Sequence, residues 1–179
     1  MTARNSLSHL ENTKSLFRYY KSLGERAIAQ LDDEQIKWHQ NENSNSISII
    51  VKHLSGNMLS RWTDFLTTDG EKSWRQRDDE FVNSIENKQE LLLAWNKGWD
   101  CLFNAIDPLT ENDLQKIVYI RDEGHTVMEA INRQLAHYAY HIGQIIFVAK
   151  ILKGEEWQSL SIPKGKSSEY NKEKLKKKK

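Results

Sequence analysis

The 179-residue sequence predicts an all-α protein folded as a four-helix bundle. Apolar residues recur every three or four positions through four long segments, which is the pattern of helices that bury one face. With two prolines and eight glycines, the chain also lacks the frequent turn residues of sheet-rich or loop-rich proteins. Its length suits one domain with a real core, expected over residues 1–162, followed by a Lys-rich tail at 163–179.

The first part of the chain predicts one long helix at about residues 6–31 and a short second helix at 33–38. A polar loop then precedes Ser46, whose hydroxyl makes it a good N-cap for the next long helix, expected over residues 47–66.

Residues 67–81 are too charged for a core helix and too aromatic for a plain linker. We expect an ordered crossover laid over the bundle surface, with Trp74 and Phe81 as its apolar anchors. Four charged residues are interpreted as ion-pair partners that hold this loop rather than as catalytic groups: Arg75, Arg77, Asp78 and Asp79.

A third long helix is expected over residues 84–106, where the following Asp107-Pro108 pair ends it because the residue before proline disfavours helical geometry. In residues 116–126, Ile117, Tyr119 and Arg121 alternate with Val118 and Ile120. This alternation predicts an extended segment with one short strand and a turn at Gly124.

The last long helix begins at Thr126, because Thr126 and Glu129 form the pattern of a capping box. Its apolar stripe continues to Leu152, and Gly154 lies where a C-terminal cap is expected.

His137 and His141 lie along the edge of this buried stripe. Histidines four positions apart have Cβ atoms about 5–6 Å apart on one helix face, which suits two imidazoles on one metal ion. His53, on the second long helix, is the best third ligand. Three imidazoles with an open fourth position are typical of a catalytic metal site, whereas the ordinary alternative is that the histidines are surface or core-edge residues.

Three amide side chains lie one turn from these histidines: Asn57, Gln134 and Gln144. Each is a candidate for orienting an imidazole through a hydrogen bond. The alternative interpretation is that they only connect helices.

Several chemistries are excluded by the pattern. HYAYH at 137–141 lacks the glutamate that a zinc protease uses as general base, and no phosphate-binding glycine loop is present. Cys101 is the only cysteine, so no intrachain disulfide can form and a cytoplasmic location is expected. No signal peptide or membrane-spanning run is evident.

The net charge of +1 conceals a basic end, because residues 163–179 hold eight lysines and only two glutamates. We interpret this segment as a solubilising tail that is disordered at its end. Nucleic-acid or membrane binding is disfavoured, since no aromatic interleaving or basic helix face accompanies the lysines.

Two stretches resemble hallmark segments of the DinB-like superfamily, in particular a bacterial branch of unknown function: HLSGNMLSRWTDFLTTDGEKSWRQRDDEF and AINRQLAHYAYHIGQIIFVAK. The resemblance extends to about Asn171. It implies an up-down-down-up bundle with a long crossover between the second and third long helices, and a homodimer. It also implies a divalent metal bound by His53, His137 and His141. Three imidazoles suit zinc, nickel, copper or iron, and of these we expect zinc or nickel.

Characterised relatives in that superfamily include bacillithiol transferases and the mycothiol-dependent maleylpyruvate isomerase. The resemblance therefore implies a metal-dependent S-transferase that joins a low-molecular-weight thiol to electrophiles. Arg61, Arg121 and Arg133 are candidates for anchoring carboxylates of such a thiol. The alternative is a non-catalytic dimeric protein in which the metal braces two helices.

Overall fold

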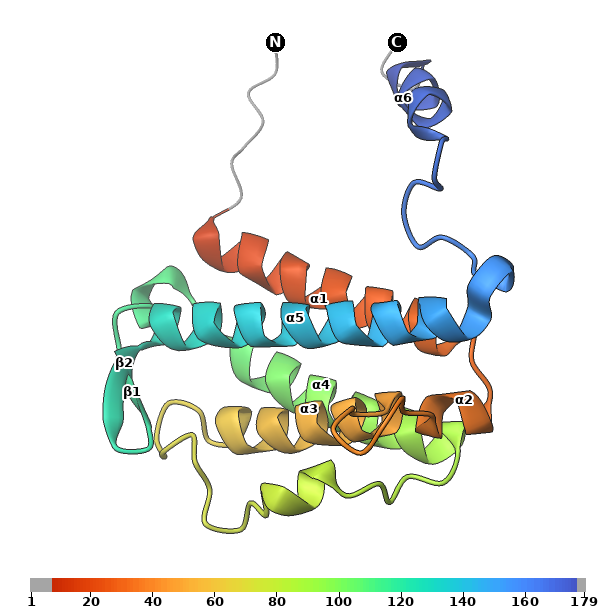
Figure 1. Cartoon of the computed structure of the whole chain (residues 1–179). Coiled ribbons are helices and arrows are strands. Elements are labelled where there is room, and N and C mark those ends of the chain that lie inside the picture. Colours follow the sequence, from red (N-terminus) through yellow and green to blue (C-terminus); the bar gives the residue numbers. More distant parts are fainter. Residues whose placement is uncertain (1–7, 177–179) are drawn as a thin grey trace.

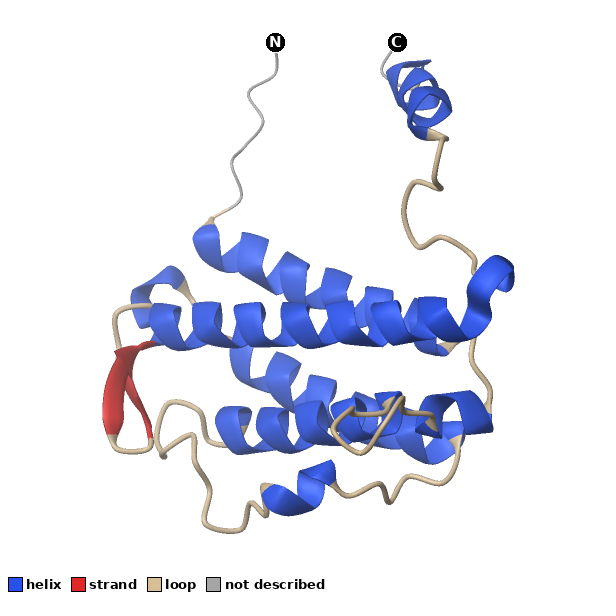
Figure 2. Ribbon diagram, in the orientation of Figure 1, coloured by secondary structure: helices blue, strands red, loops and turns tan. Residues whose placement is uncertain are grey.

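A computed structural model describes residues 8–176 (Figures 1 and 2). Within this range the protein is mostly helical, as the sequence predicts. The α-helices are α1 (His9–Ile28), α2 (Asp33–Lys37), α3 (Ile47–Trp62), α4 (Lys88–Ile106), α5 (Val127–Lys153) and α6 (Ser167–Lys176). The strands are β1 (Ile117–Ile120) and β2 (Glu123–Thr126), and three short 3-10 turns, η1 (Asp78–Phe81), η2 (Glu111–Asp113) and η3 (Gly154–Glu156), lie between the larger elements.

The four long helices pack in two pairs. α3 lies along α4, α1 lies along α5, and α3 also contacts α5. The colours of Figure 1 show that α1 and α5 run in one direction, while α3 and α4 run in the other. α3 and α4 are thus consecutive yet parallel, so residues 63–87 must travel back along the helices, because a short loop joins only antiparallel neighbours.

Bulky aromatic side chains fill the space between the pairs. The largest fully buried ones include Phe17, Trp62, Trp95, Trp99 and Tyr138. Close approach of α3 and α4 depends on Gly98, since a Cβ added there would lie 2.9 Å from Ser55 Cα. Any larger residue at Gly98 would push these two helices apart.

The predicted caps that frame the long helices are confirmed. Ser46 Oγ accepts a hydrogen bond from the Ile49 amide at 3.2 Å, at the start of α3. Thr126 and Glu129 form the complete capping box of α5, in which Glu129 Oε2 accepts from the Thr126 amide at 2.8 Å. Gly154 ends α5 with a φ of 50°.

Three of the long helices, α1, α3 and α4, are shorter than the sequence predicts. α3 ends at Trp62 rather than at residue 66, because Thr63 is extended, with a ψ of 124°, and Asp64 then adopts a left-handed φ of 49°. α4 begins at Lys88 rather than at residue 84, because the Asn87 side chain caps it by accepting from the Glu90 amide at 2.9 Å.

α1 is also shorter than expected. It ends at Ile28 rather than at residue 31, and its first turn is capped by Ser8, whose Oγ accepts from the Glu11 amide at 3.2 Å. The expected start at residue 6 lies outside the described residues.

The extended segment before α5 contains two strands rather than one. β1 pairs with β2 in antiparallel register, and Gly124 lies within β2 opposite Tyr119 instead of at the turn. Arg121 and Asp122 form the turn, both with left-handed φ values of 58° and 61°. Such a pair matches the twist of a two-residue hairpin. Asp69 supports it by accepting from both turn amides at 2.9 and 2.8 Å.

The crossover is ordered, but its anchors differ from those predicted. Trp74 is 53% exposed and Phe81 is 40% exposed, so neither fixes the loop by deep burial. The crossover is instead held by a buried ion pair, in which the Glu80 carboxylate contacts Arg75 and also His53. In the described part of the chain, no ion pair involves the other three residues assigned this role: Arg77, Asp78 and Asp79.

The Lys-rich segment contains α6, which projects away from the helix pairs in Figure 1 and has no buried residue among its described side chains. Its expected disordered end includes residues 177–179, which lie outside the described residues. Across residues 8–176, no helix combines the length and apolar character needed to cross a membrane.

Candidate metal centre and adjoining cavity

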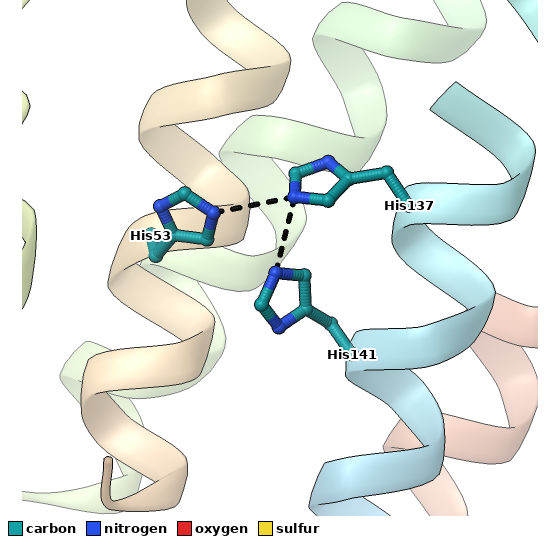
Figure 3. A group of neighbouring side chains, drawn as sticks. All are labelled: His53, His137 and His141. Atoms are coloured by element: carbon teal, nitrogen blue, oxygen red, sulfur yellow. Dashed lines mark hydrogen bonds between the residues drawn. The ribbon is translucent and has the colours of Figure 1, made fainter. Parts of the chain in front are cut away.

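Three histidines from two helices converge on one point. His137 and His141 lie one turn apart on α5, and His53 faces them from α3 (Figure 3). The Nε2 atom of His137 lies 3.4 Å from Nε2 of His53 and 3.1 Å from Nε2 of His141. The structure thus brings together the residues selected from the sequence as metal ligands.

The outward-facing nitrogens of two of these rings are already engaged. His53 Nδ1 lies 2.9 Å from Glu80 Oε2, and His141 Nδ1 lies 2.8 Å from Gln144 Oε1. A carboxylate oxygen and an amide oxygen only accept, so each Nδ1 carries the proton. An imidazole that carries its single proton on Nδ1 presents the Nε2 lone pair, and both of these Nε2 atoms lie on the His137 side.

Protein atoms alone satisfy this arrangement poorly, because a neutral His137 has at most one Nε2 proton for two facing lone pairs. A cation between the rings would accept lone pairs from all three. Tetrahedral bonds of about 2.0–2.1 Å place ligand nitrogens roughly 3.3–3.4 Å apart, close to the two distances from His137 Nε2, and all three ligand atoms lie within 4.8 Å of one another. The donor set and its spacing fit a divalent metal ion.

The protonation state of the α5 histidines is also suited to metal binding. Burial, together with the nearby His141 and His53 rings, lowers the pKa of His137 to about 3. Burial and the His53 ring lower the pKa of His141 to about 4, although the hydrogen bond with Gln144 acts in the opposite direction. Both imidazoles are neutral at pH 7, as metal ligation requires.

Glu80 links His53 to the crossover. Burial raises the pKa of this carboxyl, but hydrogen bonds from His53 and Arg75 outweigh that effect and lower it overall. Arg75 Nε donates to Glu80 Oε1 at 2.7 Å, and the Arg75 side chain is only 2% exposed. Gly56 makes room for this contact, because a Cβ there would collide with the carboxylate.

Of the three amides proposed to orient the rings, only Gln144 contacts a histidine. Asn57 Oδ1 instead accepts from the Tyr138 hydroxyl at 3.0 Å, and that hydroxyl accepts from Trp62 Nε1 at 2.9 Å. Gln134 Oε1 is buried without a hydrogen-bond partner among the described residues. Asn57 therefore joins helices rather than orienting His53.

A cavity of about 330 Å³ adjoins the three histidines. Its lining includes five arginines: Arg61, Arg75, Arg77, Arg121 and Arg133. The three arginines proposed from the sequence are among them. Arg61 and Arg121 share Glu71, at 3.2 and 3.1 Å, whereas no ion pair of the described chain involves Arg133.

Sequence reasoning did not identify Glu80 or the aromatic rings beside the histidines. Phe81 stacks on His53 with ring centroids 5.1 Å apart, and Tyr140 lies 4.1 Å from His141. Tyr140 could have been found, since it stands within the HYAYH stretch itself. Glu80 had no local signal, because it is 27 positions from His53 and only the path of the crossover joins them.

The fold and this site define a mostly helical protein with a candidate three-histidine metal centre beside an arginine-lined cavity. The chain belongs to the family described as "Protein of unknown function (DUF1572)", which matches residues 4–166. No curated protein matches the sequence.

Proposed function

We propose that this protein is a divalent-metal-dependent enzyme that transfers a low-molecular-weight thiol to electrophilic substrates. The observation that carries the proposal is the convergence of three histidine Nε2 atoms beside a cavity of about 330 Å³. Zinc or nickel is the proposed ion, because both accept imidazole ligands readily.

We further infer that the fold is the up-down-down-up four-helix bundle of the DinB-like superfamily. The opposed directions of the two helix pairs and the long return between α3 and α4 support this inference. So does the resemblance of the sequence around His53 and around His137 to that superfamily.

In this proposal His53, His137 and His141 hold the ion, while Glu80 and Gln144 fix two of the rings through their Nδ1 protons. The bound metal supplies a positive charge that lowers the pKa of a nearby thiol and favours its nucleophilic form at neutral pH. In the transfer, the thiol sulfur bonds to the electrophilic carbon, the leaving group departs with its bonding pair, and the thiol proton passes to solvent.

A purely structural metal site is the competing function, and the ligand set argues against it. Structural zinc sites are closed by four protein ligands. Within the described residues, the group contains three potential ligands, and both oxygens of the nearby Glu80 are engaged by His53 and Arg75. Space for an external ligand lies on the cavity side.

The test begins with the cobalt-loaded full-length protein and 2-mercaptoethanol. A thiol that binds the metal produces a sulfur-to-cobalt charge-transfer band, which should be absent in the His137→Ala variant. Zinc- or nickel-loaded protein is then assayed with bacillithiol and a chromogenic electrophile. A rate no higher than that of His137→Ala, together with no charge-transfer band, would reject the proposed function.

A further inference from the structure

We propose that the cavity beside the histidines selects a small molecule with two carboxylates or equivalent negative charges, which Arg77 and Arg133 bind. This inference deepens the proposed function, because such a molecule would lie next to the metal. It also revises the sequence-based assignment, in which Arg61 and Arg121 shared this role with Arg133.

The five arginines of the cavity differ in whether a carboxylate neutralises their charge. The Glu80 carboxylate contacts Arg75 and His53. Glu71 is shared by Arg61 and Arg121, at 3.2 and 3.1 Å, and lies 3.9 Å from Arg75. Arg61 also donates to the Gly70 carbonyl, so its geometry is fixed by the protein.

Arg77 and Arg133 differ from the other three. Among the described residues, neither side chain has a hydrogen-bond or ion-pair partner, although both line the cavity. No aspartate or glutamate contributes to the lining. Counting the five arginines against Glu71 and Glu80 leaves a charge of +3 from these side chains, and a divalent ion would raise it further. A cavity with this charge favours a multiply charged anion.

Gln134 supplies a second, independent indication of a ligand. Its side chain lines the cavity and is only 4% exposed, yet Oε1 has no partner among the described residues. A buried amide oxygen without a hydrogen bond is costly. A ligand hydroxyl or amine that donates to Gln134 Oε1 would remove that cost, so the expected molecule carries a donor as well as its negative charges.

The cavity volume sets the size of the ligand. At about 330 Å³, it lies at the lower end of the range for small-molecule sites. A four-carbon dicarboxylate is therefore a suitable probe, and three such molecules, two of them with one further substituent, separate the contributions. Mercaptosuccinate carries a thiol and two carboxylates, succinate lacks the thiol, and malate carries a hydroxyl in its place.

The experiment measures binding of these probes to the zinc-loaded full-length protein by calorimetry. Mercaptosuccinate should bind at least about tenfold more tightly than uncharged 2-mercaptoethanol, and added salt should reduce this advantage. Replacing both arginines (Arg77→Gln with Arg133→Gln) should weaken the binding of mercaptosuccinate and succinate by at least about tenfold. The affinity for 2-mercaptoethanol should stay unchanged.

The matched control is the pair Arg26→Gln with Lys150→Gln, which removes the same two charges from exposed positions outside this cavity. Its affinity for mercaptosuccinate should stay within about twofold of the wild type. Equal affinities of the Arg77/Arg133 double variant and the wild type would overturn the inference. Because both arginines are exposed, the variant should fold, which circular dichroism checks.

The Gln134 contribution has its own test. Malate should bind about threefold to tenfold more tightly than succinate, and Gln134→Leu should abolish this difference. An unchanged malate preference in Gln134→Leu would contradict the assigned hydrogen bond.

Failure of this inference is distinguishable from failure of the proposed function. Arginine-dependent succinate binding without a charge-transfer band for 2-mercaptoethanol would support the anion site and reject thiol activation. A charge-transfer band for 2-mercaptoethanol would support thiol activation. If dicarboxylate binding were then unaffected by replacing Arg77 and Arg133, the anion site would be rejected.

Discussion

The two sides of the candidate metal centre are held in different ways. On α5, His137 and His141 are placed by one turn of regular helix, and Gln144, three positions after His141, holds the second ring. On α3, His53 depends on Glu80, which arrives from the crossover 27 positions away and is itself held by Arg75. One side is local, whereas the other requires the tertiary fold to be complete.

This difference predicts where the site is fragile. A helix that bends or frays still keeps residues four apart on one face. The Arg75–Glu80–His53 chain has no such local support, and its two charged members are buried, so removing one leaves the other without compensation. Changes on the crossover side should therefore affect both folding and metal binding.

The largest expected effect is on stability. Glu80→Ala should lower the free energy of unfolding by about 3–5 kcal/mol, because it leaves the buried Arg75 guanidinium without its closest carboxylate. Urea denaturation of the metal-free protein measures it. The double variant Glu80→Ala with Arg75→Met should recover much of this loss, and an unchanged midpoint in Glu80→Ala would show that the pair is not needed for folding.

The next effect is on metal affinity. Removing any one of the three rings should weaken zinc binding by more than about 100-fold, beyond the range typical of residues that only orient a ligand. Competition with a chromogenic chelator measures it for His53→Ala and His137→Ala. His39→Ala is the control, since its Nδ1 faces the Asn41 carbonyl in an exposed loop. Similar zinc affinities for all three variants would show that His53 and His137 do not bind the ion.

The same local and non-local division explains what the sequence could predict. The four long helices, the caps at Ser46 and Thr126 and the histidine pair on α5 are local patterns that the sequence predicts, whereas it does not predict α6 in the Lys-rich segment. Glu80 was missed because its contact depends on the path of a loop whose conformation no short pattern determines.

The errors have the same origin. The hairpin turn at Arg121 and Asp122 was missed because its left-handed residues are not the usual glycine or asparagine. The prediction of Trp74 as an anchor rests on its hydrophobicity alone and is wrong, because hydrophobic residues often remain exposed and tertiary packing decides burial.

A smaller loss of zinc affinity is expected when either of the two residues that orient the rings, Glu80 or Gln144, is replaced. Glu80→Gln preserves the shape of the side chain but removes its charge, and should weaken zinc binding by about 10- to 100-fold. Gln144→Leu should cost less, about tenfold at most, because Gln144 is exposed and water can replace its amide oxygen. Chelator competition on both variants tests the order. A larger loss for Gln144→Leu would reverse the proposed difference between the two sides.

The smallest effect is the response of the α5 side to pH. Burial first, and then the neighbouring rings, holds the pKa of His137 near 3 and that of His141 near 4, below the ordinary value of about 6.5. Since the folded protein keeps both rings neutral, they release no protons when zinc binds at pH 5.5. The logarithm of the binding constant should then rise with pH with a slope of about 1 or less, instead of approaching 3 for three ordinary histidines.

The same lowered pKa values, which make zinc binding less dependent on pH, make the stability of the metal-free protein more dependent on pH. The unfolded chain takes up protons on these histidines below about pH 6.5, whereas the folded chain does so only near pH 3–4. Their contribution to stability is therefore complete above pH 6.5 and is lost as the pH falls toward 3. Urea titrations of the metal-free protein from pH 7 to pH 4 should show declining stability, and the decline should be shallower when His137 and His141 are both replaced by glutamine. An equal slope in that double variant would mean that other groups control the acid response.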